Sequence, residues 1–393
     1  MVLFALSAFF AVDGGFPSLV NGSTAAPPCS VPLLSFLFPL FTATVPAPAM
    51  KALVLTAPST LELQNFPTPT PADDEVLIRI RACGICGSDI HGWDGSSGRR
   101  NPPLIMGHEA AGEIAATGRN ARRFKPGDRV TFDSTIYCGE CDDCRAGRIN
   151  LCAHRRVVGV SPSEYKQHGA FAEFLAVPER IVHALPPELS FEHAAMIEPV
   201  SIAIHAVGRL ASHRPTTSVV VGAGMIGLLI VQALRWAGAK TIVAVDLENA
   251  RLELARTLGA THAFNSRTDD VPTELAKLTN HHGADATFEV VGIAPTTQLA
   301  IQLVRRGGHV VLVGNLSAKI DFPLQSAVTR ELTLHGTCGS AGEYPLCIDL
   351  IARRIIDVAP LIAARASLDE GAAWFQRLSA PDGGKYMKVI LEP

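Results

Sequence analysis

Residues 199–337 constrain the fold more than any other stretch, because short apolar runs alternate there with helical segments. The pattern is visible in SVVVGAGMIGLLIVQALRWAG, TIVAVDLENARLELARTLGA, DATFEVVG and HVVLVG. Apolar β-type runs separated by helices are typical of strands that are buried on both faces of a parallel sheet. We therefore predict an α/β fold in which this region forms a doubly wound parallel sheet.

A glycine-rich turn follows the first of these strands. The segment VVVGAGMIG, residues 219–227, has G-x-G-x-x-G spacing. The first glycine allows a tight turn, the second lets the backbone approach a pyrophosphate, and the third lets the next helix lie close to the strand. A βα turn without a ligand is the alternative, and the strand–turn–helix context favours a dinucleotide site. The predicted cofactor-binding residues are Gly222, Gly224, Met225, Ile226 and Gly227, with Val313 and Gly314 at the end of HVVLVG.

An acidic residue at the end of the next strand indicates which dinucleotide binds. Asp246 lies nineteen residues after Gly227, at the end of TIVAV. A carboxylate there accepts hydrogen bonds from the ribose hydroxyls and repels a 2′-phosphate. Glu248 adds to this repulsion, and no Arg directly follows Asp246. The sequence therefore favours NAD over NADP.

Four cysteines fall within fifteen positions: Cys138, Cys141, Cys144 and Cys152. Their spacing, C-x2-C-x2-C-x7-C, lets four thiolates close a tetrahedral zinc shell that has no open position. Such a site holds a loop together, whereas a redox CxxC pair would explain only two of the four residues. We predict a structural zinc lobe over residues 138–152. This use of cysteine also indicates a reducing, cytoplasmic compartment. Outside these ligand candidates, Cys83, Cys338 and Cys347 are predicted to be small buried hydrophobic side chains.

A second group of metal-ligand residues lies in CGICGSDIHGWDGSSGRRNPPLIMGHE, residues 83–109. Cys86 and His108 are ligand types that zinc prefers, and a catalytic zinc ion keeps one position open for water or substrate. Asp89 is a candidate for fixing the tautomer of a ligating histidine. A buried cysteine and a capping Ser-Asp turn are the structural alternative. The pattern favours a catalytic zinc site.

The rest of the chain falls into three parts. Residues 50–198 contain short β-type runs punctuated by Gly and Pro, which predict a compact, barrel-like β domain. Residues 338–393 end in the strand-like KYMKVILEP. Residues 1–49 carry a single charged residue, Asp13, and seven prolines. This composition favours a disordered or mis-started extension over an export or membrane signal.

Charge and hydropathy exclude two classes of partner. The chain has 393 residues and a formal net charge of −3, with both signs spread along it. It has no long basic block of the kind that nucleic-acid binding requires. The apolar run Leu33–Leu40 is too short and too interrupted by proline to cross a bilayer as a helix. We therefore expect neither nucleic acid nor a membrane as a partner.

Together these motifs resemble the zinc-dependent medium-chain dehydrogenases, and most closely the polyol branch that includes sorbitol (L-iditol) dehydrogenase. The resemblance covers residues 50–393. It implies a GroES-like catalytic domain over 50–198, an NAD-binding Rossmann domain over 199–337 and a return to the catalytic domain over 338–393. It also implies two zinc ions per subunit, one catalytic and one structural, and a homodimer or homotetramer.

The resemblance implies the ligands of the catalytic zinc ion. The family's catalytic cysteine and histidine fall on Cys86 and His108. The third position falls on Glu198, in MIEPVSIAIHA, where a helix is expected to end at His205. Glu109, in GHE, could take that place or orient the site instead, and the sequence leaves the choice open.

Three further roles follow from the same resemblance. A hydroxyl at Ser88 would start a proton relay, and His91 could carry the proton to solvent. A histidine in a surface turn is the alternative for His91. Arg251 resembles the family's adenosine-packing arginine, with an ordinary helix-surface arginine as the alternative.

The implied reaction is oxidation of a secondary alcohol of a polyol to a ketone, with hydride transfer to NAD. Mammalian sorbitol dehydrogenases have an Arg-Tyr pair where this chain has Gly339 and Ser340, so sorbitol itself is doubtful. A sugar-alcohol phosphate and L-threonine are alternative substrates. An NADPH-dependent enone or quinone reductase is disfavoured by the zinc residues. A catalytically silent dinucleotide-binding protein on the same scaffold is the remaining alternative.

Overall fold

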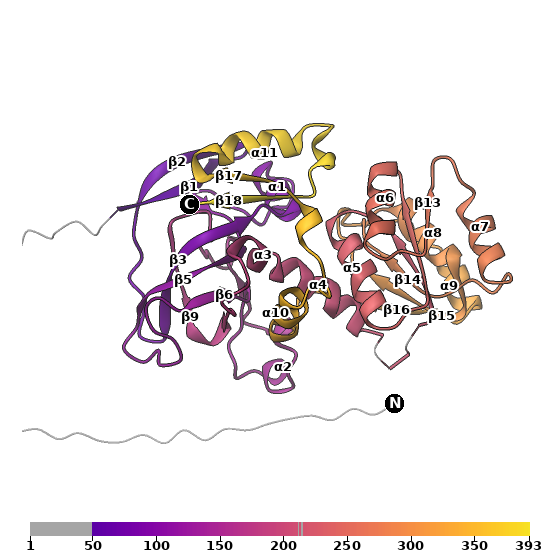
Figure 1. Ribbon diagram of the computed structural model, residues 1–393, viewed down its shortest axis with the longest axis horizontal. Helices are drawn as coiled ribbons and strands as arrows, with labels where there is room; N and C mark the ends of the chain where they lie inside the picture. Colours follow the sequence, from indigo (N-terminus) through magenta and orange to yellow (C-terminus); the bar gives the residue numbers. More distant parts are fainter. Residues whose placement is uncertain (1–48, 211, 214) are drawn as a thin grey trace, which may run out of the picture. The chain divides into compact units, whose positions relative to one another are not determined.

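The computed structural model describes residues 49–210, 212–213 and 215–393 (Figure 1). By its internal contacts the chain separates into Met1–Pro46 and Ala47–Pro393, and the described residues all belong to the second unit. The predicted N-terminal extension therefore lies outside the described residues, except for Ala49, which begins the first strand.

The region of alternating strands and helices forms a six-stranded sheet in which all neighbouring strands are parallel, as predicted. The strand order is β13-β12-β11-β14-β15-β16. The strands are β11 (Thr217–Val221), β12 (Thr241–Asp246), β13 (His262–Asn265), β14 (Ala284–Glu289), β15 (Val304–Leu312) and β16 (Thr333–Gly336). The order reverses direction between β11 and β14, which is where α/β sheets of this kind bind ligands.

Helices cover both faces of this sheet because both faces of its strands are apolar. Val220 packs in one cluster with residues of α5 (Met225–Trp236) and α6 (Asn249–Thr257). Its neighbours Val219 and Val221 pack in another cluster, with residues of α7 (Val271–Leu278) and α8 (Ala294–Leu303). This is the alternation expected of a strand whose successive side chains point to opposite faces. The sheet is therefore doubly wound, as in Rossmann domains.

The predicted β-rich part is also present. It contains a seven-stranded sheet, a three-stranded sheet and the two-stranded β7–β8. The strands are β1 (Ala49–Ala57), β2 (Thr60–Pro67), β3 (Glu75–Gly84), β4 (Leu104–Ile105), β5 (Glu109–Thr117), β6 (Arg129–Phe132), β7 (Thr135–Ile136), β8 (Arg156–Val157), β9 (Phe174–Pro178), β10 (Val182–Ala184), β17 (Ile362–Ser367) and β18 (Lys388–Glu392). Together with the parallel sheet, these strands confirm an α/β fold with a GroES-like β-rich part.

Shorter helices connect these sheets. They are α1 (Gly87–Trp93), α2 (Asp142–Arg145), α3 (Phe191–Ala195), α9 (Leu324–Thr329), α10 (Tyr344–Ala352) and α11 (Gly371–Ser379). A longer helix, α4 (Ile197–Gly208), carries Glu198 in its first turn. It ends at Gly208 and not at His205, because apolar residues of its last turn, such as Val207, are still buried.

The C-terminal segment returns to the β-rich part of the chain (Figure 1). Strand β18 pairs parallel with β17 and antiparallel with β3, where Ile390 lies opposite Gly84. Strand β3 in turn places Gly84 opposite Glu109 of β5. Strand β18 therefore adds its side chains to a sheet whose other strands, except β17, lie between Glu75 and Ala184. The domain boundaries given above stay predictions.

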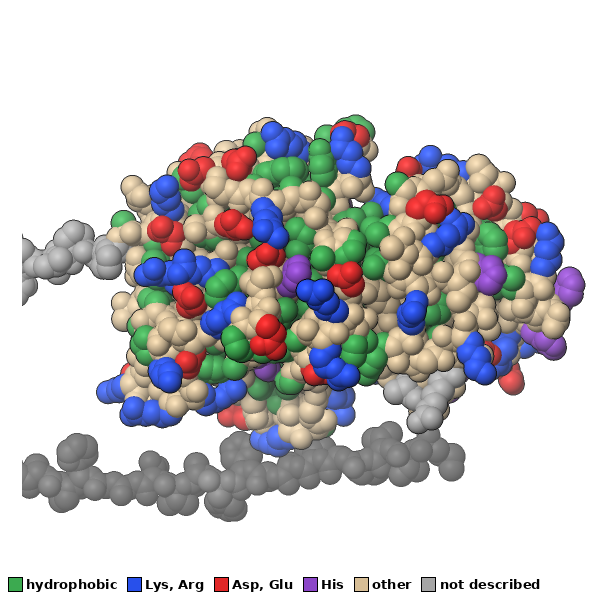
Figure 2. Space-filling view, viewed as in Figure 1, with side chains coloured by type: hydrophobic (Ala, Val, Ile, Leu, Met, Phe, Trp, Pro, Cys, Tyr) green, Lys and Arg blue, Asp and Glu red, His purple; other side chains and the backbone are tan. Residues whose placement is uncertain are grey.

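Two further observations concern the surface charge and the character of the helices. On the face shown in Figure 2, Lys and Arg side chains are interspersed with Asp and Glu side chains. Among the described helices, none combines the length and apolar character needed to cross a membrane.

Candidate active site

Three potential metal ligands converge at the start of α1 and β5. The Sγ of Cys86, a ring nitrogen of His108 and a carboxylate oxygen of Glu109 all lie within 4.8 Å of one another. Cys86 is the N-cap of α1, and its Sγ accepts the backbone N–H of Ser88 at 3.4 Å. Gly107 has a φ of +91°, a conformation that side chains disfavour, and a Cβ there would meet the ring of Phe171 at 2.7 Å. This turn delivers His108 and Glu109 together.

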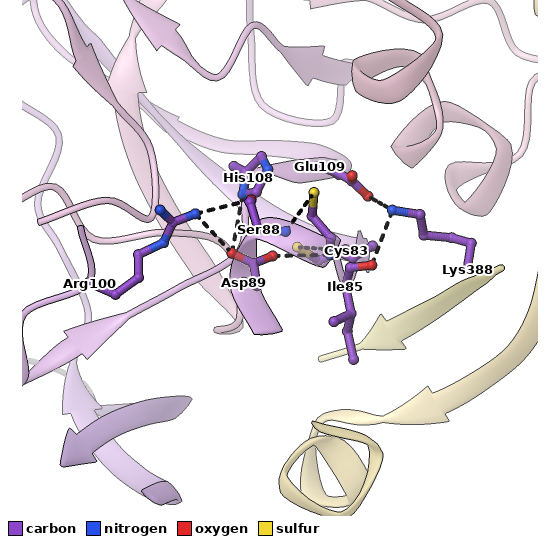
Figure 3. Close-up of polar contacts among 10 residues, drawn as sticks. Cys83, Ile85, Ser88, Asp89, Arg100, His108, Glu109 and Lys388 are labelled. Atoms are coloured by element: carbon purple, nitrogen blue, oxygen red, sulfur yellow. Dashed lines mark hydrogen bonds and ion pairs between the residues drawn. The ribbon is translucent and has the colours of Figure 1, made fainter. Parts of the chain in front are cut away.

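Asp89 supports the cluster from a fully buried position (Figure 3). Its Oδ1 lies 3.4 Å from Nδ1 of His108 and 3.4 Å from the guanidinium of Arg100, and its Oδ2 accepts the backbone N–H of Cys86 at 3.1 Å. Burial by itself would raise the pKa of Asp89, but the charges of His108 and Arg100 lower it to about 2. Asp89 is therefore ionised and lies where it can set the orientation of the imidazole, the role predicted for it from the sequence.

The charge of Asp89 also acts on His108. Burial lowers the pKa of this histidine, but the charge of Asp89 and hydrogen bonds to Asp89 and Cys86 raise it well above its usual range. Because Nδ1 faces Asp89, Nε2 is the nitrogen left to bind a metal ion. A metal ion at Nε2 would have to displace a proton, so metal binding here is coupled to proton release.

Lys388 is a site residue that the motifs do not reveal. Its ammonium, in β18, is 3% exposed, pairs with Oε2 of Glu109 and donates to the carbonyl of Ile85 at 3.1 Å (Figure 3). The only signal in the sequence is that Lys388, the second lysine of KYMKVILEP, directly precedes the apolar residues VIL. Arg100 was missed in the same way; it donates to Oγ of Ser88 at 3.3 Å and is buried beside Asp89.

Glu198 lies near the three-ligand cluster but is not part of it. It lies in the first turn of α4, and its carboxylate is close enough to His108, Glu109 and Lys388 for their charges to shift its pKa. Burial raises the pKa of Glu198 to about 7, and the nearby Glu109 and Asp133 contribute to that rise. A carboxyl group with such a pKa can hold or release a proton near neutral pH.

The segment that departs from mammalian sorbitol dehydrogenases lies beside another buried acid. The Oγ of Ser340 is 3.5 Å from Oδ2 of Asp133, whose Oδ1 accepts the backbone N–H of Thr135 at 2.8 Å. Burial raises the pKa of Asp133 to about 6. Gly339 has a φ of +62°. These two positions therefore carry a hydroxyl and a turn, with no cationic side chain.

Ser88 and His91 lie on the exposed side of α1. They are three residues apart on one helix and so share a face. The hydroxyl of Ser88 accepts a hydrogen bond from Arg100, which leaves its own proton free to be donated. Nδ1 of His91 is 4.0 Å from Oδ2 of Asp94. The proton relay stays a prediction.

The four cysteines of the lobe converge as their spacing predicted. Their sulfurs all lie within 4.8 Å of one another. Cys138 Sγ is 3.5 Å from Cys152 Sγ and 3.9 Å from Cys144 Sγ. Sulfurs bound tetrahedrally at about 2.3 Å from one zinc ion are about 3.8 Å apart, so the donor set and its spacing fit zinc. Backbone N–H groups of Cys144 and Ala153 lower the pKa of Cys141 to about 6, which favours the thiolate that a metal ion needs.

The glycine turn has the geometry expected of a dinucleotide-binding loop. Gly222 has a φ of +103°, and a Cβ on Gly227 would collide with the carbonyl oxygen of Gly222. Gly224 is the N-cap of α5, and a Cβ there would meet no atom within 4 Å. The turn thus packs the helix tightly while leaving open space at its N-terminus, where a phosphate would fit.

A cavity of about 1230 Å³ adjoins this turn. Gly222, Asp246 and Arg251 line it, together with residues of the C-terminal segment such as Gly384. The carboxylate of Asp246 accepts the backbone N–H groups of Ala223, Leu247 and Glu248 at 2.7, 2.8 and 3.0 Å. The other predicted cofactor residues are not among the lining residues: Gly224, Met225, Ile226, Gly227, Val313 and Gly314.

Two of the predicted cofactor residues make close contacts with neighbouring segments. The guanidinium of Arg251 donates to the carbonyl of Gly384 at 2.7 Å and lies 3.7 Å from Asp246. Its packing against adenosine stays a prediction. Gly314 packs so closely against Val291 and Gly292 that a Cβ there would collide with their backbones. This contact places the end of β15 beside the end of β14.

One cysteine prediction is wrong. Cys83 and Cys347 are buried, as expected of small apolar side chains, but Cys338 is exposed. Its Sγ lies 3.4 Å from the guanidinium of Arg155, so it makes a polar contact in place of apolar packing.

Comparisons with known proteins agree with this geometry. Residues 72–187 match the alcohol dehydrogenase GroES-like domain family, and residues 226–353 match the zinc-binding dehydrogenase family. Sorbitol dehydrogenase of Bacillus subtilis (strain 168) is 38% identical over 326 residues, 82% of this chain and 91% of that protein. D-arabitol-phosphate dehydrogenase of Enterococcus avium is 33% identical, covering 84% of this chain and 92% of that one.

A solved structure shows the same architecture. A zinc-binding dehydrogenase from Sinorhizobium meliloti 1021, crystallised with NADP, superposes with a TM-score of 0.80 at 32% identity. The match covers 88% of this chain and 100% of that chain.

The lobe generates a first prediction. Cys144→Ser should release the zinc ion of the lobe and lower the free energy of unfolding by at least about 2 kcal/mol, because the binding energy of a structural zinc ion contributes directly to folding. Metal content by plasma mass spectrometry and denaturant unfolding measure the two effects. Cys338→Ser, a change outside both ligand groups, is the control and should keep its metal. Full zinc content in Cys144→Ser would contradict the prediction.

Proposed function

This chain belongs to the zinc-dependent alcohol and polyol dehydrogenases, and from that premise we propose that it oxidises a secondary alcohol of a polyol to a ketone with NAD⁺. The observation that carries the proposal is the convergence of Cys86, His108 and Glu109, a donor set that suits zinc. When bound, the zinc ion supplies Lewis-acid polarisation of the alcohol oxygen, and the nicotinamide supplies the hydride acceptor.

The protein's own residues prepare the site for this chemistry. Asp89 orients His108 and keeps it anchored by an ion pair. The carboxyl group of Glu198, with a pKa of about 7, is suited to holding a proton beside the reacting alcohol. Ser88 and then His91 offer a route for the released proton toward solvent, since both side chains lie on the exposed side of α1.

We assign the third ligand position to Glu109. A carboxylate oxygen of this residue is within 4.8 Å of the ligand atoms of Cys86 and His108, whereas Glu198 does not belong to that group. Lys388 pairs with Oε2 of Glu109, so Oε1 is the oxygen available for a metal ion. The buried ammonium also offsets the negative charge that a thiolate and a carboxylate bring to the same site.

NAD is the proposed cofactor although the Sinorhizobium meliloti protein was crystallised with NADP. Asp246 lines the cavity and is held in place by three backbone N–H groups, so its charge cannot easily turn away from a bound ribose. Glu248 lines the same cavity. Two carboxylates there would repel a 2′-phosphate.

An unphosphorylated polyol fits the site better than a phosphorylated one. The two cations that contact the candidate ligands and their neighbours, Arg100 and Lys388, are each paired with a carboxylate. Gly339 and Ser340 add no positive charge. The name of the Enterococcus avium relative includes a sugar-alcohol phosphate, so phosphorylated substrates belong in the test. The homo-oligomer and the cytoplasmic location stay predictions.

The proposal is tested by NADH formation from NAD⁺ with sorbitol, xylitol, L-iditol, galactitol, galactitol 1-phosphate, L-threonine and simple secondary alcohols. We expect activity on at least one unphosphorylated polyol, loss of that activity after zinc chelation, and its return with added zinc. Cys86→Ala should be inactive, and Cys347→Ala, a buried cysteine outside both ligand groups, should stay active. Chelation-resistant turnover, or turnover by Cys86→Ala, would contradict the metal assignment.

The ligand assignment predicts different effects for the two glutamates. Glu109→Gln should weaken zinc binding by about 10- to 100-fold or more, because a neutral amide is a poorer ligand. Glu198→Gln should keep its zinc and lower kcat by about 100-fold, because it removes a proton acceptor. Glu192, on α3, pairs with Arg365 of β17. Glu192→Gln is the control and should change neither the zinc affinity nor kcat. Zinc loss from Glu198→Gln with retention in Glu109→Gln would reverse the assignment.

The cofactor preference is tested at Asp246. Asp246→Asn keeps one oxygen that can accept the backbone N–H groups of Leu247 and Glu248 and loses the second, which accepts from Ala223. It also removes the charge that repels a 2′-phosphate. We expect the ratio of kcat/KM for NAD to that for NADP to fall about tenfold, which corresponds to one charge interaction of moderate strength. Equal ratios in the variant and the parent protein would show that Asp246 does not set the preference.

A further inference from the structure

The four-cysteine lobe is joined to helix α4 through one side chain. Asn150 lies between Cys144 and Cys152 and is 5% exposed. Its Nδ2 donates to the carbonyl of Cys338 at 2.8 Å and lies 3.4 Å from Nε2 of His205, on α4. The lobe therefore contacts two segments that come much later in the chain.

On the other side of its ring, His205 contacts the segment that follows β16. Nδ1 of His205 lies 2.6 Å from Oε1 of Glu343, and Oε2 of Glu343 accepts the backbone N–H of Ala341. The donors and acceptors agree if the imidazole is neutral with its proton on Nδ1, since Nε2 then accepts from Asn150 and Nδ1 donates to Glu343. The segment Thr337–Glu343, which connects β16 to α10, is thus held at both Cys338 and Glu343.

The lobe has little to hold its shape except its cysteines. Within residues 138–152 only Asn150 and Cys152 are buried, and α2 contributes no buried residue. A segment without an apolar core depends on the ion that binds its thiolates. The position of Asn150 therefore depends on the lobe being loaded and intact.

Helix α4 connects this network to the candidate active site. Glu198 and His205 are seven residues apart on the same helix, about two turns, so a displacement at His205 is transmitted along a rigid element. Ser340, in the held segment, contacts Asp133, whose charge acts on Glu198. Both sets of contacts connect the four-cysteine lobe to Glu198, which we place beside the substrate.

We propose that Asn150 is a positioning residue through which the four-cysteine lobe fixes Thr337–Glu343 and helix α4, and through α4 the carboxylate of Glu198. The lobe then supports substrate binding as well as stability. This inference rests on the proposed function for its kinetic consequence, but its structural consequence is independent of any activity.

The experiment compares Asn150→Asp, His205→Ala and the double variant with the parent protein. Asn150→Asp keeps the size of the side chain but cannot donate to the carbonyl of Cys338. We expect amide hydrogen exchange in 337–343 and KM for the alcohol each to rise about tenfold, the equivalent of one lost hydrogen bond. Because Glu198 is displaced as well, kcat should also fall, by less than in Glu198→Gln. The double variant should be no worse than the more affected single variant, because both changes break one network.

Arg148→Gln is the matched control, since Arg148 lies in the lobe and its side chain pairs with the half-buried Asp143 of the same lobe. It should change neither exchange nor KM. Zinc content is measured for every variant, and His205→Ala, outside the lobe, decides the result if Asn150→Asp loses metal. Unchanged exchange and KM in zinc-loaded variants, or additive effects in the double variant, would overturn the proposal. If the parent protein oxidises no alcohol, the proposed function fails while hydrogen exchange still tests the network.

Discussion

The pairing of β18 with β3 is the interaction on which the candidate active site depends. It brings the last strand of the chain beside the start of α1 and β5, and with it Lys388. A lysine buried to this extent is tolerated only because Glu109 and the carbonyl of Ile85 satisfy it. The sheet contact and the ion pair therefore depend on each other, since neither charge is stable in this position alone.

Buried charges also compensate one another around Asp89, on the other side of the candidate site. Asp89 is fully buried between the cations of Arg100 and His108, so one carboxylate is balanced by two positive groups. On the opposite side, Lys388 faces Glu109 with Glu198 nearby. Buried groups of opposite charge therefore stand next to each other on both sides of the candidate site. They hold a thiolate, an imidazole and a carboxylate close together in the arrangement that a zinc ion needs.

The spacing of nearby residues predicted the fold class and the short motifs of the candidate sites. It did not predict contacts between residues far apart in the chain. The glycine turn, the four cysteines and the sequence from Cys86 to Glu109 are short motifs whose geometry follows from neighbouring residues, and the fold class followed from strand and helix periodicity. Lys388 lies 279 residues from Glu109, and Asn150 lies 188 from Cys338. No periodicity links such positions, because tertiary packing alone brings them together. For the same reason Cys338 was wrongly expected to be buried.

The return of β18 to β3 also affects how the protein is made. During synthesis β3, α1 and β5 leave the ribosome long before residues 388–392. Until then Glu109 lacks its buried counter-ion, and Gly84 and Cys83 lack their partners in the last strand. The strands of the parallel sheet all precede β18 in the chain, so that sheet can begin to fold while the candidate active site still lacks Lys388. A chain truncated before β18 would therefore contain every motif of the candidate active site and still leave Glu109 without its buried counter-ion.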